Sequence, residues 1–521
     1  MKPIRSKSRS TPNMDMHKKG EMPEKFLIKK NKSILPFFTP YDSEFFPPEG
    51  EIIEEYSIDK ARVKIVKQKD LERYFYFLDP PEFHLKTSEI KNILLEFLGK
   101  KPIESEITKR YRDGLGILEI FFKDENLEDV FIDSKNPRVY VYHKKYGLMD
   151  TNIIFNEKDL KRIAIKLREI SGRPFDEGIP IIHLSIGKVR VVGIRYPFSF
   201  SGIGYAFRIH EKKAWTIPKL IDKKMFDLKT GALMSLLVES FSTILITGPR
   251  GAGKTSLLSA LLFEVPKTER IIIIEDTAEL PISEMIRAGY RVEHVRISAW
   301  ESEYEMSAED AFRASLRLGE SFLVVGEVRG PETKVLFEAM RVGAAGNTVM
   351  GTIHGASAED VYDRIVNEIG VPPASFKATD FIISVNRLRA GSVIKKIRRL
   401  IEIKEVKKNW VKSPVLEKGF LDICKYDRKK DSWKILNLEE SDAIERILFK
   451  NGWEFREFLT ELDVRKKFLR ACIKKKILEP VSYSKVKSLY YSLVEEGHSG
   501  VEALNLIFKS KMDVLKKLLE K

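Results

Sequence analysis

Hydrophobic residues between positions 242 and 385 occur in short runs of strand length that alternate with helical stretches. The runs are STILITG, RIIIIED, SFLVVGE, GNTVMGTI and DFIISV. Each is rich in β-branched residues and almost continuously apolar, which is typical of strands buried on both faces of a parallel sheet. Strands alternating with helices predict an α/β domain, and we place it at residues 216–412.

The N-terminal part of the chain has a different pattern, in which apolar and polar positions alternate. Residues 36–100 contain ARVKIVKQ and RYFYFLD, followed by the helical stretch TSEIKNILLEFLGK, for which Thr87 or Ser88 is the expected N-cap. Residues 101–215 contain VYVYHKKYG, KVRVVGIRYPF and GIGYAFRIH, with the helical stretch NEKDLKRIAIKLREISG among them. We therefore expect two small α+β domains.

The two ends of the chain differ from these domains. Residues 1–35 are polar, basic and poor in β-branched residues, which predicts a disordered tail. Residues 413–521 open with strand-like segments and finish in amphipathic stretches such as MDVLKKLLEK. We expect them to form a mostly helical extension.

Composition narrows the functional classes. The chain has 521 residues, 43% of them hydrophobic, which is enough for several packed domains. Its net charge of +15 favours anionic partners such as nucleic acid, phosphates or an acidic membrane surface. The two cysteines, Cys424 and Cys472, form no metal-binding pattern, and no apolar stretch approaches the ~18 residues of a membrane span. These features favour a cytosolic protein.

The strongest chemical signal is GPRGAGKT, which follows STILIT and precedes the helical SLLSALLFEV. It fits the P-loop pattern GxxxxGK[ST], whose glycines let backbone N–H groups surround phosphates. Lys254 would bridge the β- and γ-phosphates of ATP, and Thr255 would offer its hydroxyl to Mg²⁺. The expected nucleotide-binding residues are Gly248, Pro249, Arg250, Gly251, Ala252, Gly253, Lys254, Thr255 and Ser256.

Carboxylates end two further strand-like runs. Glu275 and Asp276 follow RIIII, and Glu327 follows SFLVVG, where Gly326 stands in place of the Asp usual in nucleotide-hydrolysing motors. Because the C-terminal ends of parallel strands lie at one edge of a sheet, both glutamates can approach Lys254 there. The simpler interpretation is that acidic residues end buried strands and meet water.

His354, in AGNTVMGTIHG, follows the next run along the chain. A single histidine after a buried strand is more often a hydrogen-bonded structural residue than a participant in chemistry. At the phosphate edge of a sheet, however, an imidazole can sense the γ-phosphate or an acidic neighbour.

Four motifs in this order, GPRGAGKT, IEDTAEL, VVGEVRGPE and GNTVMGTIHG, resemble those of the type II/IV secretion ATPase superfamily, which powers secretion, type IV pili and the archaeal flagellum. VYVYHKKYGLMDTNIIF, ISGRPFDEGIPIIH and KVRVVGIRYPFSFSGIGYAFRIH look like the N-terminal domain of archaeal members. The resemblance covers residues 50–410. It implies an α/β fold class: a RecA-like P-loop motor domain with smaller N-terminal α+β domains and a C-terminal, mostly helical extension.

The resemblance also implies roles for the residues at the strand ends. Glu327 would orient the Mg²⁺ shell and the attacking water, while Gly326 keeps the strand end slim. Glu275 would be the base for that water. Arg329 would hold these loops together, and His354 would complete the catalytic set.

Members of the superfamily assemble as hexameric rings in which arginines of the N-terminal domain reach the nucleotide. By motif position these are Arg190 and Arg208, with Arg195 as a third candidate. An arginine supplied in this way neutralises charge on the transferred phosphoryl group.

The implied partners are a membrane-embedded platform protein and an acidic lipid surface, for a cytoplasmic protein held at the inner face of the membrane. No nucleic-acid-binding signature is visible, so we expect no strong binding to DNA or RNA. Three alternatives stay open: a nucleic-acid translocase built on the same P-loop core, an archaellum motor, and a nucleotide-binding switch without efficient turnover.

Overall fold

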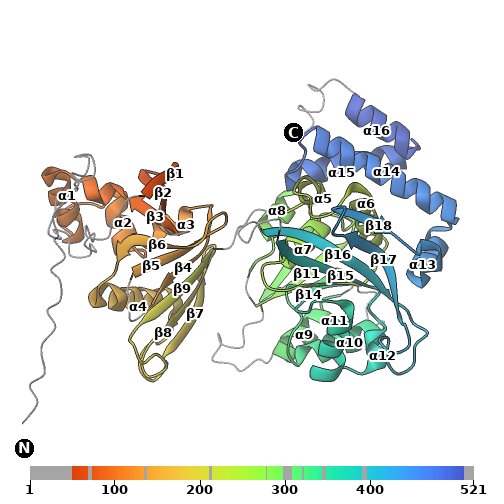
Figure 1. Cartoon of the computed structure of the whole chain (residues 1–521), viewed down its shortest axis with the longest axis horizontal. Coiled ribbons are helices and arrows are strands. Elements are labelled where there is room, and N and C mark those ends of the chain that lie inside the picture. Colours follow the sequence, from red (N-terminus) through yellow and green to blue (C-terminus); the bar gives the residue numbers. More distant parts are fainter. Residues whose placement is uncertain are drawn as a thin grey trace, which may run out of the picture. The chain divides into compact units, whose positions relative to one another are not determined.

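The chain forms two compact units, Met1–Ile209 and His210–Lys521 (Figure 1). The computed structural model describes residues 50–68, 73–133, 138–209, 214–276, 278–296, 308–319, 322–342, 348–389 and 396–509. The tail predicted for residues 1–35 and the stretch MDVLKKLLEK lie outside the described residues.

The first unit is built on a mixed sheet with the strand order β1-β2-β3-β6-β5-β4-β9-β8-β7. Its strands are β1 (Gly50–Ile58), β2 (Ala61–Gln68), β3 (Tyr74–Asp79), β4 (Leu127–Ile132), β5 (Arg138–His143), β6 (Gly147–Ile154), β7 (Ile181–Ile186), β8 (Val189–Ile194) and β9 (Gly204–Ile209). Neighbouring strands are antiparallel except β3 and β6, which pair in parallel. The sheet therefore combines strands from both N-terminal ranges of the sequence.

The helical elements of the first unit's described residues are η2 (Pro81–His84), α1 (Thr87–Phe97), α2 (Glu106–Arg112), α3 (Leu118–Lys123) and α4 (Glu157–Ser171). The helix predicted at NEKDLKRIAIKLREISG is confirmed as α4, whose cap Asn156 accepts a hydrogen bond from the Asp159 N–H. The predicted cap of α1 is wrong, because Thr87 is already helical and the cap is Lys86. The Lys86 N–H donates to the Glu89 carboxylate at 2.7 Å, so the glutamate closes this helix end.

The second unit holds a sheet with the order β12-β11-β13-β14-β10-β15-β16-β17-β18. Its strands are β10 (Ile244–Thr247), β11 (Arg270–Glu275), β12 (Arg291–Arg296), β13 (Phe322–Val325), β14 (Thr348–Ile353), β15 (Phe381–Arg389), β16 (Lys396–Val406), β17 (Phe420–Asp427) and β18 (Ser432–Ile435). The strands β10 to β15 pair in parallel, and β16 to β18 continue the sheet in antiparallel pairs. All five strands predicted from the apolar runs are confirmed.

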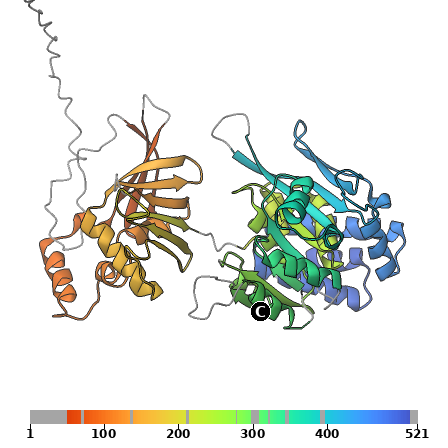
Figure 2. The same ribbon diagram turned by 90° about the horizontal axis from the view of Figure 1, so that it is seen from below.

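Successive residues of the central strands enter two different cores, which explains their continuous apolar character. Ile271 and Ile273 of β11 pack on one face of the sheet, and Ile272 and Ile274 pack on the other. The first face is covered by α5 (Ile217–Asp222), α6 (Leu228–Glu239), α7 (Lys254–Leu262) and α8 (Ile282–Arg287). The second is covered by α9 (Ala308–Leu316), α10 (Glu332–Val342), α11 (Ala358–Tyr362), η3 (Asp363–Glu368) and α12 (Pro373–Phe376). Figure 1 shows the two helical layers on opposite sides of the strands, and Figure 2 has the second layer in front of the sheet.

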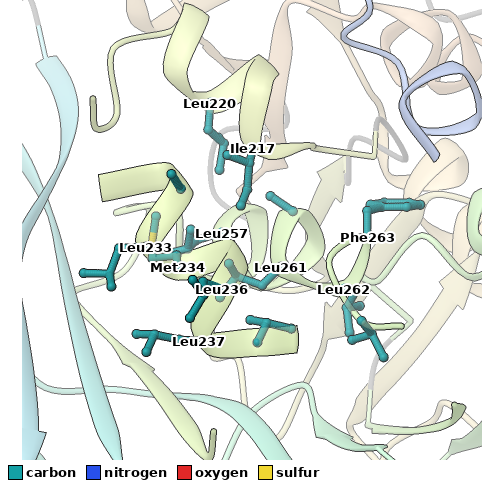
Figure 3. Packing of buried hydrophobic residues seen from close by; sticks show 14 of the residues in the cluster. Ile217, Leu220, Leu233, Met234, Leu236, Leu237, Leu257, Leu261, Leu262 and Phe263 are labelled. Carbon is teal, nitrogen blue, oxygen red and sulfur yellow. The ribbon is translucent and has the colours of Figure 1, made fainter. Parts of the chain in front are cut away.

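On the first face, the helix α6 packs tightly against α7, the predicted P-loop helix. Leu233 and Leu237 of α6 and Leu257 and Leu261 of α7 are all 0% exposed (Figure 3). Full burial of such a side chain stabilises a fold by about 1.5–3 kcal/mol. This packing therefore fixes the helix that begins at Lys254.

The C-terminal part of the chain contains η4 (Leu438–Glu440), α13 (Asp442–Asn451), α14 (Phe455–Lys474), α15 (Pro480–Glu495) and α16 (Gly500–Lys509). Buried residues of these helices share one core with α5, α6 and α7. The fold class predicted from the sequence is confirmed: a P-loop α/β domain preceded by α+β structure and followed by a mostly helical extension. Among the described helices, none has the length and apolar character needed to cross a membrane.

Candidate nucleotide-binding site

The turn between β10 and α7 is the predicted P-loop. Its glycines Gly248, Gly251 and Gly253 have φ of 157°, 74° and 100°, values that favour glycine. A Cβ on Gly248 would meet the carbonyl oxygen of Val385 on the neighbouring strand. The turn is therefore a bare backbone segment at the N-terminus of a helix, which is the arrangement that binds phosphates.

Three predicted residues meet beside this turn. The Nζ of Lys254 lies 3.2 Å from Nδ1 of His354, and Nε2 of His354 lies 3.2 Å from Oε1 of Glu327. Because an ammonium group only donates, Nδ1 is the acceptor, and the neutral imidazole carries its proton on Nε2, facing the carboxylate. Burial and the charge of Lys254 lower the pKa of His354, which favours this neutral form. A single polar chain thus links the P-loop lysine to the carboxylate after β13.

Lys254 is also held by the P-loop itself. Its Nζ donates to the carbonyl of Gly248 at 2.8 Å and lies 3.4 Å from that of Pro249. Burial lowers the pKa of Lys254, although the carboxylates of Glu327 and Glu279 favour its charged form. The remaining predicted P-loop side chains differ in exposure: Arg250 is exposed, Ser256 half-buried and Ala252 fully buried.

Glu275 ends β11 and is 4% exposed. Its Oε1 accepts hydrogen bonds from the backbone N–H groups of Glu279 and Leu280, both at 3.1 Å, and its Oε2 lies 3.2 Å from Nε2 of His294. Gly326 leaves room for this side chain, because a Cβ there would lie 2.9 Å from Cγ of Glu275. The close approach of Glu275 is a structural reason for Gly-Glu at the end of β13.

The loops after β11 and β13 are tied together at the same edge of the sheet. Arg329 forms an ion pair with Asp276, one from each loop. The Oγ1 of Thr255 lies 3.2 Å from Oε2 of Glu279. Glu279 was not among the predicted site residues. Its negative charge within the motif IEDTAEL was the only feature of the sequence that could have indicated it.

Sequence reasoning also missed two arginines on β15 and β16. The Nε of Arg398 donates to the carbonyl of Gly251 at 3.0 Å, and a Cβ on Gly251 would lie 3.4 Å from Nη1 of Arg387. Arg387 and Arg398 are direct partners across the two strands. Their guanidinium groups add positive charge beside the P-loop. In the sequence, only the basic stretches NRLR and KKIRR indicated this charge.

The arginines predicted to reach nucleotide from the N-terminal domain lie in the first unit. Arg190 of β8 and Arg208 of β9 are direct cross-strand partners, so their side chains share one face of the sheet. Arg208 forms two bonds to the carboxylate of Asp129 on β4, at 2.8 and 3.3 Å. Arg195 donates to the carbonyl of Phe175 at 3.1 Å and lies over its ring.

The residues present fit ATP and Mg²⁺. Within the described ranges, no group of three or more His, Cys, Asp or Glu is arranged to hold a metal ion. Mg²⁺ does not require one, because it usually keeps several waters and binds one or two side chains together with substrate phosphates. Thr255 and Glu327 suit that mode, and the positive φ of Gly248, Gly251 and Gly253 gives the turn the bare backbone that binds phosphates.

The chain belongs to the family described as type II/IV secretion system protein, which it matches over residues 124–480. The match includes every P-loop and strand-end residue described above, together with Arg190 and Arg208. It ends at Pro480, the first residue of α15.

Two relatives come from Methanocaldococcus jannaschii. The uncharacterized protein MJ0781 is 28% identical over 337 residues, which are 57% of this chain and 46% of that protein. The uncharacterized protein MJ0900 is 27% identical over 409 residues, which are 76% of this chain and 70% of that protein. The chain thus spans about half the length of the first relative. The X-ray structure of the Yersinia pseudotuberculosis ATPase DotB matches with a TM-score of 0.41 and 14% identity, covering 84% of this chain and 94% of that one.

Proposed function

We propose that this chain is an ATPase that drives secretion or the assembly of a type IV pilus-like filament across an archaeal membrane. Family membership supports a secretion machine. The observation that carries the ATPase assignment is the polar chain from Lys254 through His354 to Glu327. A P-loop that only held nucleotide would not need a strand-end carboxylate connected to its lysine.

In this proposal each site residue has a separate role in ATP hydrolysis. The P-loop N–H groups and Lys254 bind the phosphates, and Lys254 exchanges its bond to His354 for the γ-phosphate. Thr255 would hold Mg²⁺, which would supply positive charge to offset the negative charge on the transferred phosphoryl group. Glu327 orients the attacking water, and Glu275 accepts its proton.

His354 is placed to report which nucleotide is bound. When Lys254 turns to the phosphates, Nδ1 of His354 loses its donor and can take up a proton instead. Nε2 continues to contact Glu327, so a change at the P-loop reaches the end of β13 through one side chain. Arg329, paired with Asp276, keeps the two strand-end loops moving together.

We further propose that the protein works as a homohexamer in the cytoplasm, at the inner face of the membrane. In that ring, Arg190 and Arg208 would supply positive charge to the nucleotide. A membrane-embedded platform protein would receive the conformational change driven by ATP hydrolysis. The net charge of +15 suits acidic loops of that platform and anionic lipid.

The proposal is tested by measuring ATP hydrolysis of the full-length chain with and without DNA or acidic liposomes. We expect magnesium-dependent turnover that rises with protein concentration as rings form. Salt-sensitive co-sedimentation with acidic liposomes and little stimulation by duplex or single-stranded DNA are also expected. Tight DNA binding at physiological salt, coupled to strong stimulation of turnover, would identify a nucleic-acid translocase instead.

A further inference from the structure

The C-terminal helices contact the far end of the P-loop helix through buried charges. Glu264 follows α7 closely and is 0% exposed. Lys487 of α15 places its Nζ 2.7 Å from Oε2 of Glu264, and 3.1 and 3.4 Å from the backbone carbonyls of Glu264 and Phe263. A cation at the carboxyl end of a helix offsets the negative end of its dipole and satisfies its open carbonyl groups.

A second carboxylate completes this cluster. Glu239, the last residue of α6, lies 2.8 Å from Nζ of Lys487 and 2.5 Å from Nη1 of Arg465 on α14. Tyr491 of α15 also donates to Glu239. Two anions from the motor helices therefore face two cations from the extension, and Figure 1 shows α14 and α15 beside α5 and α6.

Neutral donors also contact both carboxylate oxygens of Glu264. Ser235 of α6 donates to Oε2 at 2.7 Å, and Tyr483 of α15 donates to Oε1 at 2.8 Å. Burial by itself disfavours the charged form of Lys487, yet Glu239 and Glu264 raise its pKa above the usual range. Removing one member of a buried ion pair leaves the other charge without compensation, so each of these groups helps to hold the others in place.

We infer that Lys487 is a positioning residue for the P-loop helix, and that α14 and α15 are part of the nucleotide-binding machinery. The helix α7 runs from Lys254 to Leu262, so a displacement at its carboxyl end moves the P-loop lysine at the other end. The inference rests on the proposed ATPase function. Lys487 lies beyond residue 480, outside the segment that matches the family.

Coupling between the P-loop and the helices α14 and α15 must be reciprocal. Nucleotide bound at the P-loop should therefore also reduce local unfolding of these helices. The first test is hydrogen exchange of the full-length wild-type chain with and without MgATP. We expect slower exchange in the P-loop and in residues 480–495. Protection of the P-loop without any change in 480–495 would overturn the inference, whereas no nucleotide binding at all would overturn the proposed function.

Variants separate positioning from stability. Lys487→Met should lower turnover by about 10²-fold, the scale of a 1 Å displacement at a reacting centre. Lys450→Met, at an exposed lysine in the last turn of α13, is the matched control and should behave as wild type. Lys487→Arg should restore part of the activity.

A neutral double variant guards against simple unfolding. Glu264→Gln combined with Lys487→Met removes one charge of each sign, so it should keep the wild-type melting temperature more closely than Lys487→Met. We expect it to remain slow in turnover because the hold on α7 is lost. A double variant with both wild-type melting temperature and wild-type turnover would overturn the positioning role.

Discussion

The missing side chain of Gly326 is what lets Glu275 lie against the end of β13. Gly326→Ala would place a methyl group 2.9 Å from Cγ of Glu275, so this carboxylate must move. We expect a loss of roughly 10²-fold in turnover, the scale of disturbing a placed acid–base group, with MgATP still bound. Gly178→Ala is the control, because its Cβ would meet nothing closer than 3.4 Å. Unchanged turnover in Gly326→Ala would remove Glu275 from the reaction.

In the proposed site, His354 should make nucleotide binding depend on pH. Burial, Lys254 and Arg364 lower its pKa, while Glu327 acts in the opposite direction. Phosphates favour the protonated imidazole, so binding takes up a proton. Affinity for MgATP should therefore increase as the pH falls from about 7.5 to about 5.5.

Titration calorimetry of the wild type and His354→Gln across this range checks the effect. The difference between the two proteins should approach tenfold in affinity per pH unit where one full proton is taken up. Folding stability without nucleotide should respond to pH in the opposite direction. Below about pH 6.5 the His354 imidazole binds more protons in the unfolded chain than in the folded one, so acidification lowers the stability of the fold. Parallel pH profiles for the two proteins would exclude His354 as the titrating group.

At the scale of elements, Arg208 can have two roles. It can only join neighbouring strands of the first unit, or it can also act on the nucleotide. Its ion pair with Asp129 joins β9 to β4. If Arg208 also acts on nucleotide, Arg208→Gln should lower turnover by roughly 10³-fold, as removal of a catalytic arginine does. Asp129→Asn weakens the same pair but keeps the guanidinium, and should cost far less. Equal losses in the two variants would assign Arg208 a structural role.

The central strands could be predicted because their successive residues pack into the cores on both faces of the sheet. Ile271 to Ile274 are buried on both faces, which leaves an uninterrupted apolar run in the sequence. The strand β12 was missed because RVEHVR carries charged residues at the edge of the sheet. The strands β17 and β18 were recognised as strand-like, but their pairing with β16 requires contacts that no local pattern records.

The candidate site was predictable to the extent that its residues lie within motifs. Lys254, Glu327 and His354 each follow an apolar run, and parallel pairing of those runs brings them together. Arg398 contacts the P-loop from 147 positions away. Lys487 and Glu264 are separated by 223 positions. Such pairs depend on how the elements pack, so the sequence gives only their charge.

At the scale of the whole molecule, the second unit combines a parallel motor sheet, antiparallel strands and a helical extension around shared cores. The extension contributes buried residues to the same core as α6 and α7. Its loss would expose that core and leave Glu239 and Glu264 without their cations. The segment after residue 413 is therefore integral to this unit.

The central claim is that the chain hydrolyses ATP with Glu327 as the residue that orients water. Its most direct test is turnover and MgATP affinity of Glu327→Gln beside Lys254→Ala in the full-length protein. We expect Glu327→Gln to bind MgATP as the wild type does and to lose roughly 10²-fold or more in turnover. Lys254→Ala should weaken binding itself. Hydrolysis by Glu327→Gln at the wild-type rate would contradict the proposed mechanism.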